Sequence, residues 1–393
     1  MPHLNRLVLN FPGFETTTAV HQIERLAAGG SKTAELWGFE LDTGKINQSE
    51  QSNKTVVEFN TSGNDWTAST RYVQFSWADI ISAYENKPYP QSLFFHFPKY
   101  LSFILDGSFR RYSKASRRYW GFSIYPILLM ILFSIVSGGL MYWLLSPFSV
   151  HWVLIAIPAF LIFIVFCKYP GDNFYINLSI NDWAFARDMC SGKNKDINDR
   201  FVQFADHLVK EISRSKPDEI IIVGHSFGSV WATVALAIAL EKKPKLFSGK
   251  RVTFLALGSS LLKIGLVRQA KFFKSAVIQV LSQKDLLWHE IQTKTDFISF
   301  YKSDPFKPMK IEQTACEVIV HRINFKHALS KARHSKMLKS MYLAHRQYIL
   351  YCDKRVHHDF QLRIFGPFFA DDLAKDTTLA FESPLLNPEE TTE

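Results

Sequence analysis

The sequence contains few cysteines, and none of them form a closely spaced pair. Its 393 residues include only four, Cys167, Cys190, Cys316 and Cys352, which lie far apart. A structural zinc site needs close pairs, and a disulfide-held secreted domain needs a denser set, so the sequence argues against both. We therefore expect a reducing compartment and no bound metal.

The chain also lacks a signal-peptide core and a nucleic-acid-binding motif. Within residues 1–10 the apolar run is short, so any signal for membrane insertion has to lie further along the chain. The formal charge is +10, but the basic residues gather beside one apolar segment and in one late segment. Because neither segment carries a recognised motif, nucleic acid is not an expected partner.

The chain is organised around a Gly-x-Ser-x-Gly motif formed by Gly224, Ser226 and Gly228. A β-branched run precedes the motif, and an apolar, alanine-rich run at 230–240 follows it. A strand, this motif and a helix in that order are typical of a nucleophile elbow, in which the two glycines avoid a clash with neighbouring backbone. The helix N-terminus would place the backbone N–H of Phe227 beside the Ser226 hydroxyl, where an oxyanion could develop.

A long uncharged region lies in the middle of the chain. Residues 119–145 contain no charge, a Ser-Pro turn follows, and residues 150–167 are again apolar and end at Lys168. Both segments are long enough for a bilayer core of about 30 Å, so we predict a transmembrane hairpin with the lipid bilayer as partner. The positive-inside rule then predicts a multi-pass protein of the inner or cell membrane whose catalytic domain is cytoplasmic. The basic flank that supports this orientation consists of Arg110, Arg111, Lys114, Arg117 and Arg118.

The remaining segments predict an α/β fold with a doubly wound, mostly parallel sheet. Strand-like runs occupy 6–10, 35–41, 55–60, 67–75, 220–223, 251–257, 286–292 and 317–323, and those between 35 and 75 suggest an antiparallel portion. Helical periodicity occupies 17–28, 181–189, 197–214, 230–240, 266–283 and 334–351. Residues 93–105 fit either an interfacial amphipathic helix or a packed core helix.

Four segments, 7–15, 224–228, 288–296 and 345–348, together resemble the α/β-hydrolase superfamily. More narrowly, they resemble uncharacterised bacterial membrane-associated, lipase- or esterase-like α/β hydrolases with a helical hairpin before the elbow. The resemblance covers most of residues 5–367, although only the elbow is specific to the superfamily. It implies a serine hydrolase with its nucleophile, acid and histidine in that chain order.

The resemblance implies an acid after the second strand past the elbow strand and a histidine after the last strand. Asp296, just past strand 286–292, is the first candidate for the acid, and Asp285 is the alternative if that strand is instead 276–281. His345 lies in a His-x-Gln-Tyr sequence that resembles the narrower group, whereas His334 better fits the usual spacing from the last strand. We expect Ser226, Asp296 and His345 to form the catalytic triad.

The other late histidines are expected to have no catalytic role. His321 falls within the last predicted strand, and His357 and His358 are expected in a solvated loop. Upstream, a turn after the first strand offers the backbone N–H of Phe14 as the second half of an oxyanion hole, opposite Phe227.

Two features depart from the superfamily pattern. The first strand begins almost at residue 5, which leaves no room for the two antiparallel strands that usually precede it, so the sheet must be shortened or completed by strands from 35–75. The hairpin precedes the elbow and does not occupy the usual lid position.

The expected segments are the N-terminal part of the hydrolase domain (1–109), the basic flank and hairpin (110–169), the C-terminal part with the elbow (170–367) and a disordered acidic tail (368–393).

The predicted function is a membrane-anchored serine hydrolase that cleaves an ester, lipid or thioester bond through an acyl-enzyme, without a cofactor. The alternative from another class is a catalytically silent α/β-hydrolase fold that acts as a membrane-anchored interaction module.

Overall fold

A nine-stranded mixed sheet forms the centre of the molecule. The computed structural model describes residues 3–49, 53–214, 216–312 and 315–386. The strand order is β2-β4-β5-β1-β6-β7-β8-β9, with β3 paired to β4. The strands are β1 (His3–Phe11), β2 (Glu40–Thr43), β3 (Asn47–Ser49), β4 (Lys54–Ser62), β5 (Thr67–Phe75), β6 (Glu219–His225), β7 (Val252–Leu257), β8 (Leu286–Thr293) and β9 (Glu317–Ile323).

The sheet is parallel from β5 across β1 to β9, and β2, β3 and β4 add antiparallel pairs at the other edge. The prediction of a mostly parallel α/β sheet is therefore confirmed. Strands from the region 35–75 complete the sheet, as expected from the early position of β1. Since β1 pairs with β6, the segments before and after the hairpin share one sheet.

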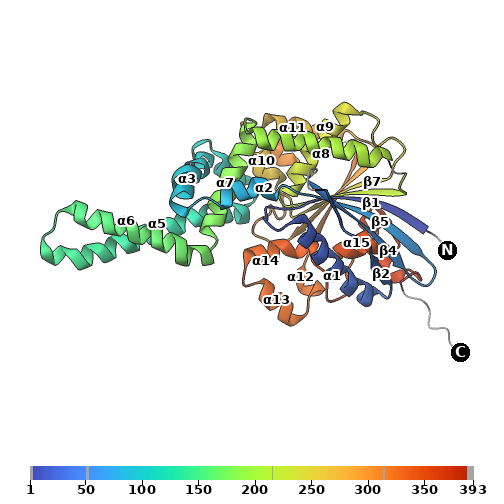
Figure 1. Ribbon diagram of the computed structural model, residues 1–393, viewed down its shortest axis with the longest axis horizontal. Coiled ribbons are helices and arrows are strands. Elements are labelled where there is room, and N and C mark those ends of the chain that lie inside the picture. The colour runs from blue at the N-terminus through green and yellow to red at the C-terminus, as the bar shows by residue number, and fades with distance from the viewer. Residues whose placement is uncertain (1–2, 50–52, 215, 313–314, 387–393) are drawn as a thin grey trace.

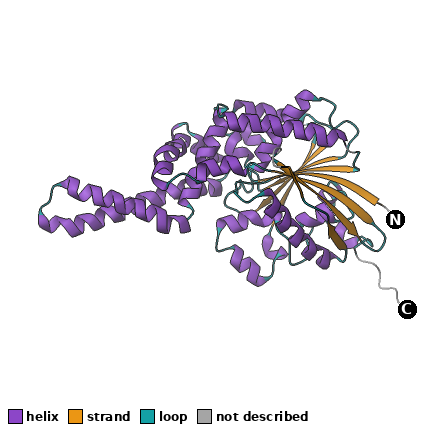
Figure 2. Cartoon of the chain, viewed as in Figure 1, coloured by secondary structure: helices purple, strands orange, loops and turns teal. Residues whose placement is uncertain are grey.

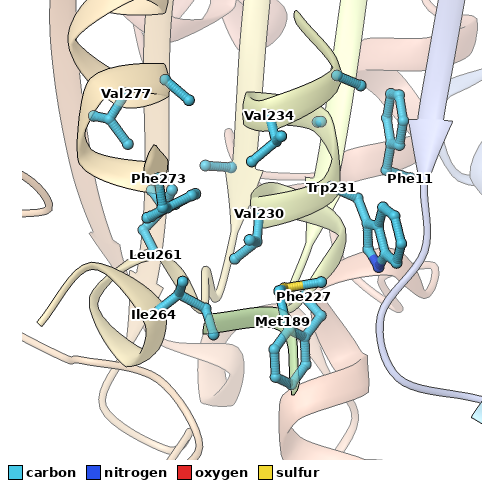
Figure 3. Packing of buried hydrophobic residues seen from close by; sticks show 14 of the residues in the cluster. Phe11, Met189, Phe227, Val230, Trp231, Val234, Leu261, Ile264, Phe273 and Val277 are labelled. Carbon is cyan, nitrogen blue, oxygen red and sulfur yellow. The ribbon is translucent and has the colours of Figure 1, made fainter. Parts of the chain in front are cut away.

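Helices cover both faces of the sheet (Figures 1 and 2). One face carries α8 (Lys195–Arg214), α9 (Gly228–Lys242) and α11 (Lys271–Leu281), and the other carries α1 (Ala19–Trp37) and α15 (Phe360–Phe365). Figure 3 shows Val230 and Val234 of α9 facing Phe273 and Val277 of α11. Because α9 is buried on nearly every side, the position of its N-terminus is fixed by the core.

The hairpin consists of α5 (Arg117–Leu145) and α6 (Trp152–Asn173), joined by the 3-10 turn η1 (Ser146–Phe148), and it projects from the body (Figure 1). Both helices are long and apolar enough to cross a membrane. Helix α6 is longer than predicted and continues through Pro170 and Gly171. Many large apolar side chains on the pair are exposed, including Leu128, Ile131, Leu132, Ile135, Leu154, Ile157, Phe160 and Leu161.

The remaining described helices lie outside the hairpin, and among them α10 packs against α9 and α11. They are α2 (Ala78–Glu85), α3 (Tyr89–Leu105), α4 (Ser108–Ala115), α7 (Ile176–Ser191), α10 (Leu261–Gly265), η2 (Lys307–Met309), α12 (Phe325–Ala328), α13 (Lys331–Met337), α14 (Met341–Arg346), η3 (Gln347–Ile349), α16 (Asp372–Lys375) and α17 (Leu379–Glu382).

Four local predictions were wrong. Residues 35–37 belong to helix α1, only residues 271–281 of the predicted helix 266–283 are helical and form α11, and the predicted helix 334–351 divides into α13, α14 and η3. The side chains of Ser330 and Ser340 cap α13 and α14 and so begin a new helix each time. The tail predicted to be disordered forms α16 and α17, and it buries Leu373 in α16 and Leu386 after α17. Residues 387–393 lie outside the described part of the chain.

The interpretation of His357 and His358 as a solvated loop was wrong for His358, which is buried beneath the sheet. Its ring lies 6.3 Å from that of Phe325, and neither ring nitrogen has a hydrogen-bond partner among the described residues. Burial, together with the nearby charges of His357 and Arg363, lowers the pKa of His358 to about 3. His358 is therefore neutral in the folded protein at pH 5, where an unfolded chain would protonate it.

Replacing His358 with leucine should flatten the dependence of stability on pH. The unfolded chain takes up a proton near pH 6.5 but the folded one does not, so the free energy of unfolding falls as the pH is lowered below 6.5. His358→Leu should remove a slope of up to about 1.4 kcal/mol per pH unit and should be more stable than the wild type at pH 5. Denaturant unfolding in detergent at pH 7, 6 and 5 measures this, and equal slopes for the two proteins would contradict it.

Candidate active site

Ser226 lies in a sharp turn between β6 and α9. Its φ is +54°, a left-handed conformation that costs a non-glycine residue energy and persists where the surroundings impose it. The two motif glycines explain how the turn fits. A Cβ on Gly224 would lie 2.5 Å from the Cα of Ser229, and one on Gly228 would lie 1.9 Å from the carbonyl oxygen of Phe11. The residues around Ser226 thus have the strand–turn–helix geometry of a nucleophile elbow.

Backbone and hydroxyl hydrogen bonds hold the turn. The N–H of Ser226 donates to the carbonyl of Leu257 at 3.0 Å. Its own carbonyl accepts from the N–H of Ser229 at 3.1 Å, the Oγ of Ser229 at 2.6 Å and the N–H of Ser260 at 3.2 Å. Ser226 is therefore fixed from both the helix and the neighbouring strand β7.

Asp296 and His345 lie next to each other although they are far apart in sequence. Asp296 follows the carboxyl end of β8, His345 lies in α14, and the Nδ1 of His345 is 2.8 Å from the Oδ2 of Asp296. The other carboxylate oxygen, Oδ1, accepts from the N–H of Ile298 at 2.8 Å. Burial acts to raise the pKa of Asp296, but the charge and hydrogen bond of His345 outweigh it and lower that pKa. Asp296 is therefore an ionised, buried acceptor that directs the Nδ1 proton of His345 toward itself.

The second ring nitrogen of His345 is available for chemistry. Its Nε2 is buried and has no hydrogen-bond partner among the described residues. With Nδ1 donating to Asp296, Nε2 carries a lone pair, as a general base requires. Ser226 and His345 line the same cavity of about 360 Å³, together with Gly13 and Phe14.

Larger hollows elsewhere lack this combination. One of about 530 Å³ is lined by α2, α7 and α8 residues, and one of about 830 Å³ lies along β2 and β4. Neither contains Ser226, Asp296 or His345, so their size gives no reason to place the chemistry there.

Two backbone N–H groups beside Ser226 are candidates for an oxyanion hole. The turn after β1 lies against Ser226, because a Cβ on Gly13 would be 3.2 Å from the Cβ of Ser226. Phe227 is the N-cap residue of α9. Within the described part of the chain, the N–H groups of Phe14 and Phe227 donate no hydrogen bond. Both remain free to bind a negatively charged oxygen.

The structure separates the alternative candidates from this site. Asp285 is exposed just before the start of β8, whereas Asp296 follows the end of the same strand. At about 3.3 Å per residue, the strand separates its two ends by roughly 26 Å. The strand 276–281 that would have favoured Asp285 belongs to helix α11. His334 lies in α13, outside the cavity, and His321 lies in β9, where it hydrogen-bonds His289 at 3.0 Å.

His225 is a site residue that the sequence reasoning missed. Its Nε2 lies 2.9 Å from the backbone carbonyl of His345, and the two rings are 4.9 Å apart. Burial and the nearby charge of His345 lower the pKa of His225 to about 3, so its ring is neutral and donates to that carbonyl. His225 thus ties α14 to the elbow strand. Its position before Ser226 in the motif was the only available signal, and the motif accepts any residue there.

Ser260 is a second missed residue. It follows β7, and its Oγ lies 3.4 Å from the Oγ of Ser226. A hydrogen bond at that distance is weak, but among the described residues it is the one hydrogen bond of the Ser226 hydroxyl. The sequence offered no sign of it beyond the end of a strand.

Metal-binding residues do not gather at this site. Across the described ranges, no group of three or more His, Cys, Asp or Glu side chains could hold a metal ion. The four cysteines are buried free thiols.

Comparisons with protein-family models, curated proteins and solved structures found no match.

Proposed function

We propose that the protein is a serine hydrolase that transfers an acyl group from an ester, lipid or thioester to water. The observation that carries the proposal is the strained elbow serine in the same cavity as a buried His345–Asp296 pair whose second ring nitrogen is free. An Asp–His pair alone is a common structural feature. Its convergence with a nucleophile and two free N–H groups matches the parts that acyl transfer needs.

The reaction proceeds through an acyl-enzyme. The Nε2 of His345 takes the proton from the Oγ of Ser226 as that oxygen attacks the substrate carbonyl carbon. The N–H groups of Phe14 and Phe227 bind the oxyanion, and Asp296 stabilises the imidazolium. The tetrahedral intermediate then collapses, and Nε2 returns the proton to the leaving alcohol or thiol. Water repeats the attack with His345 as base and releases the acid and the free serine.

The substrate is proposed to be reached from the membrane. Phe122 of α5, and Tyr175 and Leu178 just past α6, line the catalytic cavity, so its wall is continuous with the base of the hairpin. We propose that α5 and α6 cross the cell membrane and that the basic flank keeps the catalytic domain on the cytoplasmic side. An amphiphilic acyl substrate could then enter from the lipid. A substrate survey that found activity only on soluble peptides would contradict this.

Labelling with a fluorophosphonate probe tests the proposed chemistry. Membrane-inserted wild-type protein should become labelled at Ser226, because the probe phosphonylates an activated serine, and Ser226→Ala should lose the label. Ser31→Ala is the matched control, since Ser31 is exposed on α1 and does not line the cavity. Absence of label in folded wild-type protein would contradict the hydrolase and favour a silent fold that acts as an interaction module.

A further inference from the structure

Helix α3 exposes an apolar stripe to solvent although it lies outside the hairpin. Phe94 is 74% exposed and Leu105 is 87% exposed, and between them Pro98 is exposed and Leu101 half-buried. The spacing of these four residues, i, i+4, i+7 and i+11, places them on one side of a helix. Phe95 and Ile104 widen the stripe, at 55% and 43% exposure. A stripe of this size on a soluble surface marks an interaction site.

The opposite side of α3 is fixed to the body. Tyr100 stacks on Trp183 of α7 at 5.4 Å, and Phe103 meets the same ring edge-on at 4.9 Å. His96 hydrogen-bonds Asn181 of α7 at 2.8 Å. These contacts fix the rotation of α3 about its axis. The helix therefore cannot turn its apolar stripe toward the body.

Helix α3 lies beside the base of the hairpin (Figure 1). The hydroxyl of Tyr100 donates to the backbone carbonyl of Ser123, two turns into α5. Helix α7, on which α3 packs, begins at Ile176, directly after α6 ends at Asn173. Helix α3 thus contacts the hairpin near the level at which both apolar helices join the body.

Three exposed cations, called here the basic row, follow α3 along the chain. Arg110 and Lys114 lie one turn apart on α4, and Arg117 begins α5. All three are exposed, and none forms an ion pair with another described residue. Such a row is suited to anionic lipid headgroups, whose surface potential attracts lysine and arginine near the membrane.

We propose that α3 lies in the bilayer interface, with its apolar stripe among the upper acyl chains and with Arg110, Lys114 and Arg117 on anionic headgroups. Interfacial helices insert an apolar side about 5–10 Å and keep basic residues at the headgroups, and here α4 and α5 supply those basic residues for α3. The hairpin and α3 together then fix the orientation of the body on the membrane. With the hairpin alone, the body would be free to tilt. This inference rests on the proposed insertion of the hairpin and is independent of the hydrolase activity.

Spin labels on single cysteines in nanodiscs that contain anionic lipid test the proposal. Because the four native cysteines are buried, labels can be directed to Phe94→Cys and Leu105→Cys. Both should be reached several-fold better by oxygen than by a water-soluble nickel complex, relative to Ser31→Cys on α1. A label at Leu140→Cys checks the insertion of the hairpin separately. Labels at 94 and 105 that are as open to nickel as the one at Ser31, with Leu140 protected, would overturn the proposal.

The basic row and a competing occupant have their own controls. Replacing Arg110, Lys114 and Arg117 together with glutamine, or using neutral lipid, should move the label at 105 toward water while that at Leu140 stays protected. If the label at 105 stays in the bilayer both in the glutamine variant and in neutral lipid, the proposed role of anionic headgroups is overturned. Protection that appears only in discs with two copies of the chain would identify a second copy as the partner and overturn the bilayer as occupant.

Discussion

Ser226→Ala and His345→Ala should each lower kcat by about a millionfold, and the double variant should lose no more than either single one. The two side chains act in one step, because the Nε2 of His345 is the proposed acceptor of the Ser226 proton. Once one of them is gone, the other has no catalytic partner. The rate that remains comes from substrate binding and from the oxyanion donors, which both variants keep.

Hydrolysis of a chromogenic acyl ester by the detergent-solubilised or nanodisc-embedded protein measures these losses. His334→Ala is the matched control for the histidine, since it lies outside the cavity and should change kcat by less than about twofold. Losses that multiply in the double variant would show that the two residues act separately. Full activity of His345→Ala, with loss in His334→Ala, would reverse the assignment of the base.

The position of Ser226 could be predicted from the sequence because the information is local. The strand, the motif and the helix lie within one short segment. The two glycines are needed because the turn brings neighbouring backbone too close for a Cβ at either position. The coarse sheet could be predicted for the same reason, since each buried strand reads as an apolar run between turn residues. Asp296 and His345 were different. Their proximity is a tertiary contact, and only resemblance to a family directed attention to them.

The misjudged end of α1 shows how a local rule fails. Gly29 and Gly30 read as a helix break, yet the helix continues through them to Trp37. A Cβ on Gly29 would lie 2.3 Å from the Nε2 of Gln361, and one on Gly30 would lie 2.7 Å from the Cε2 of Phe365. The glycines are there to let α15 pack closely against α1. No sequence pattern near residue 29 could reveal a partner more than 300 residues away.

The ordered C-terminal segment has a similar cause. Its acidic, Pro- and Thr-rich composition predicts disorder, but Arg251 forms ion pairs with Asp371 and Asp372, and Leu373 and Leu386 are buried in the core beneath the sheet. Two of the acidic residues that favoured a disordered segment, Asp371 and Asp372, are therefore the ones that bind it to Arg251. Composition gives the number of charges but not their partners, so it could not distinguish a disordered acidic segment from one held by ion pairs.

Asp296→Asn should lower kcat by about ten-thousandfold while leaving the fold intact. Asparagine has nearly the same shape, and its amide oxygen can still accept from the N–H of Ile298. Its NH2 group cannot accept the Nδ1 proton of His345 and would donate to Nδ1 instead, which forces the ring proton onto Nε2. His345 then cannot take the proton of Ser226. Asp285→Asn, at the opposite end of β8, is the matched control and should act like the wild type in the same ester assay. Near-normal turnover in Asp296→Asn would show that the buried pair is structural.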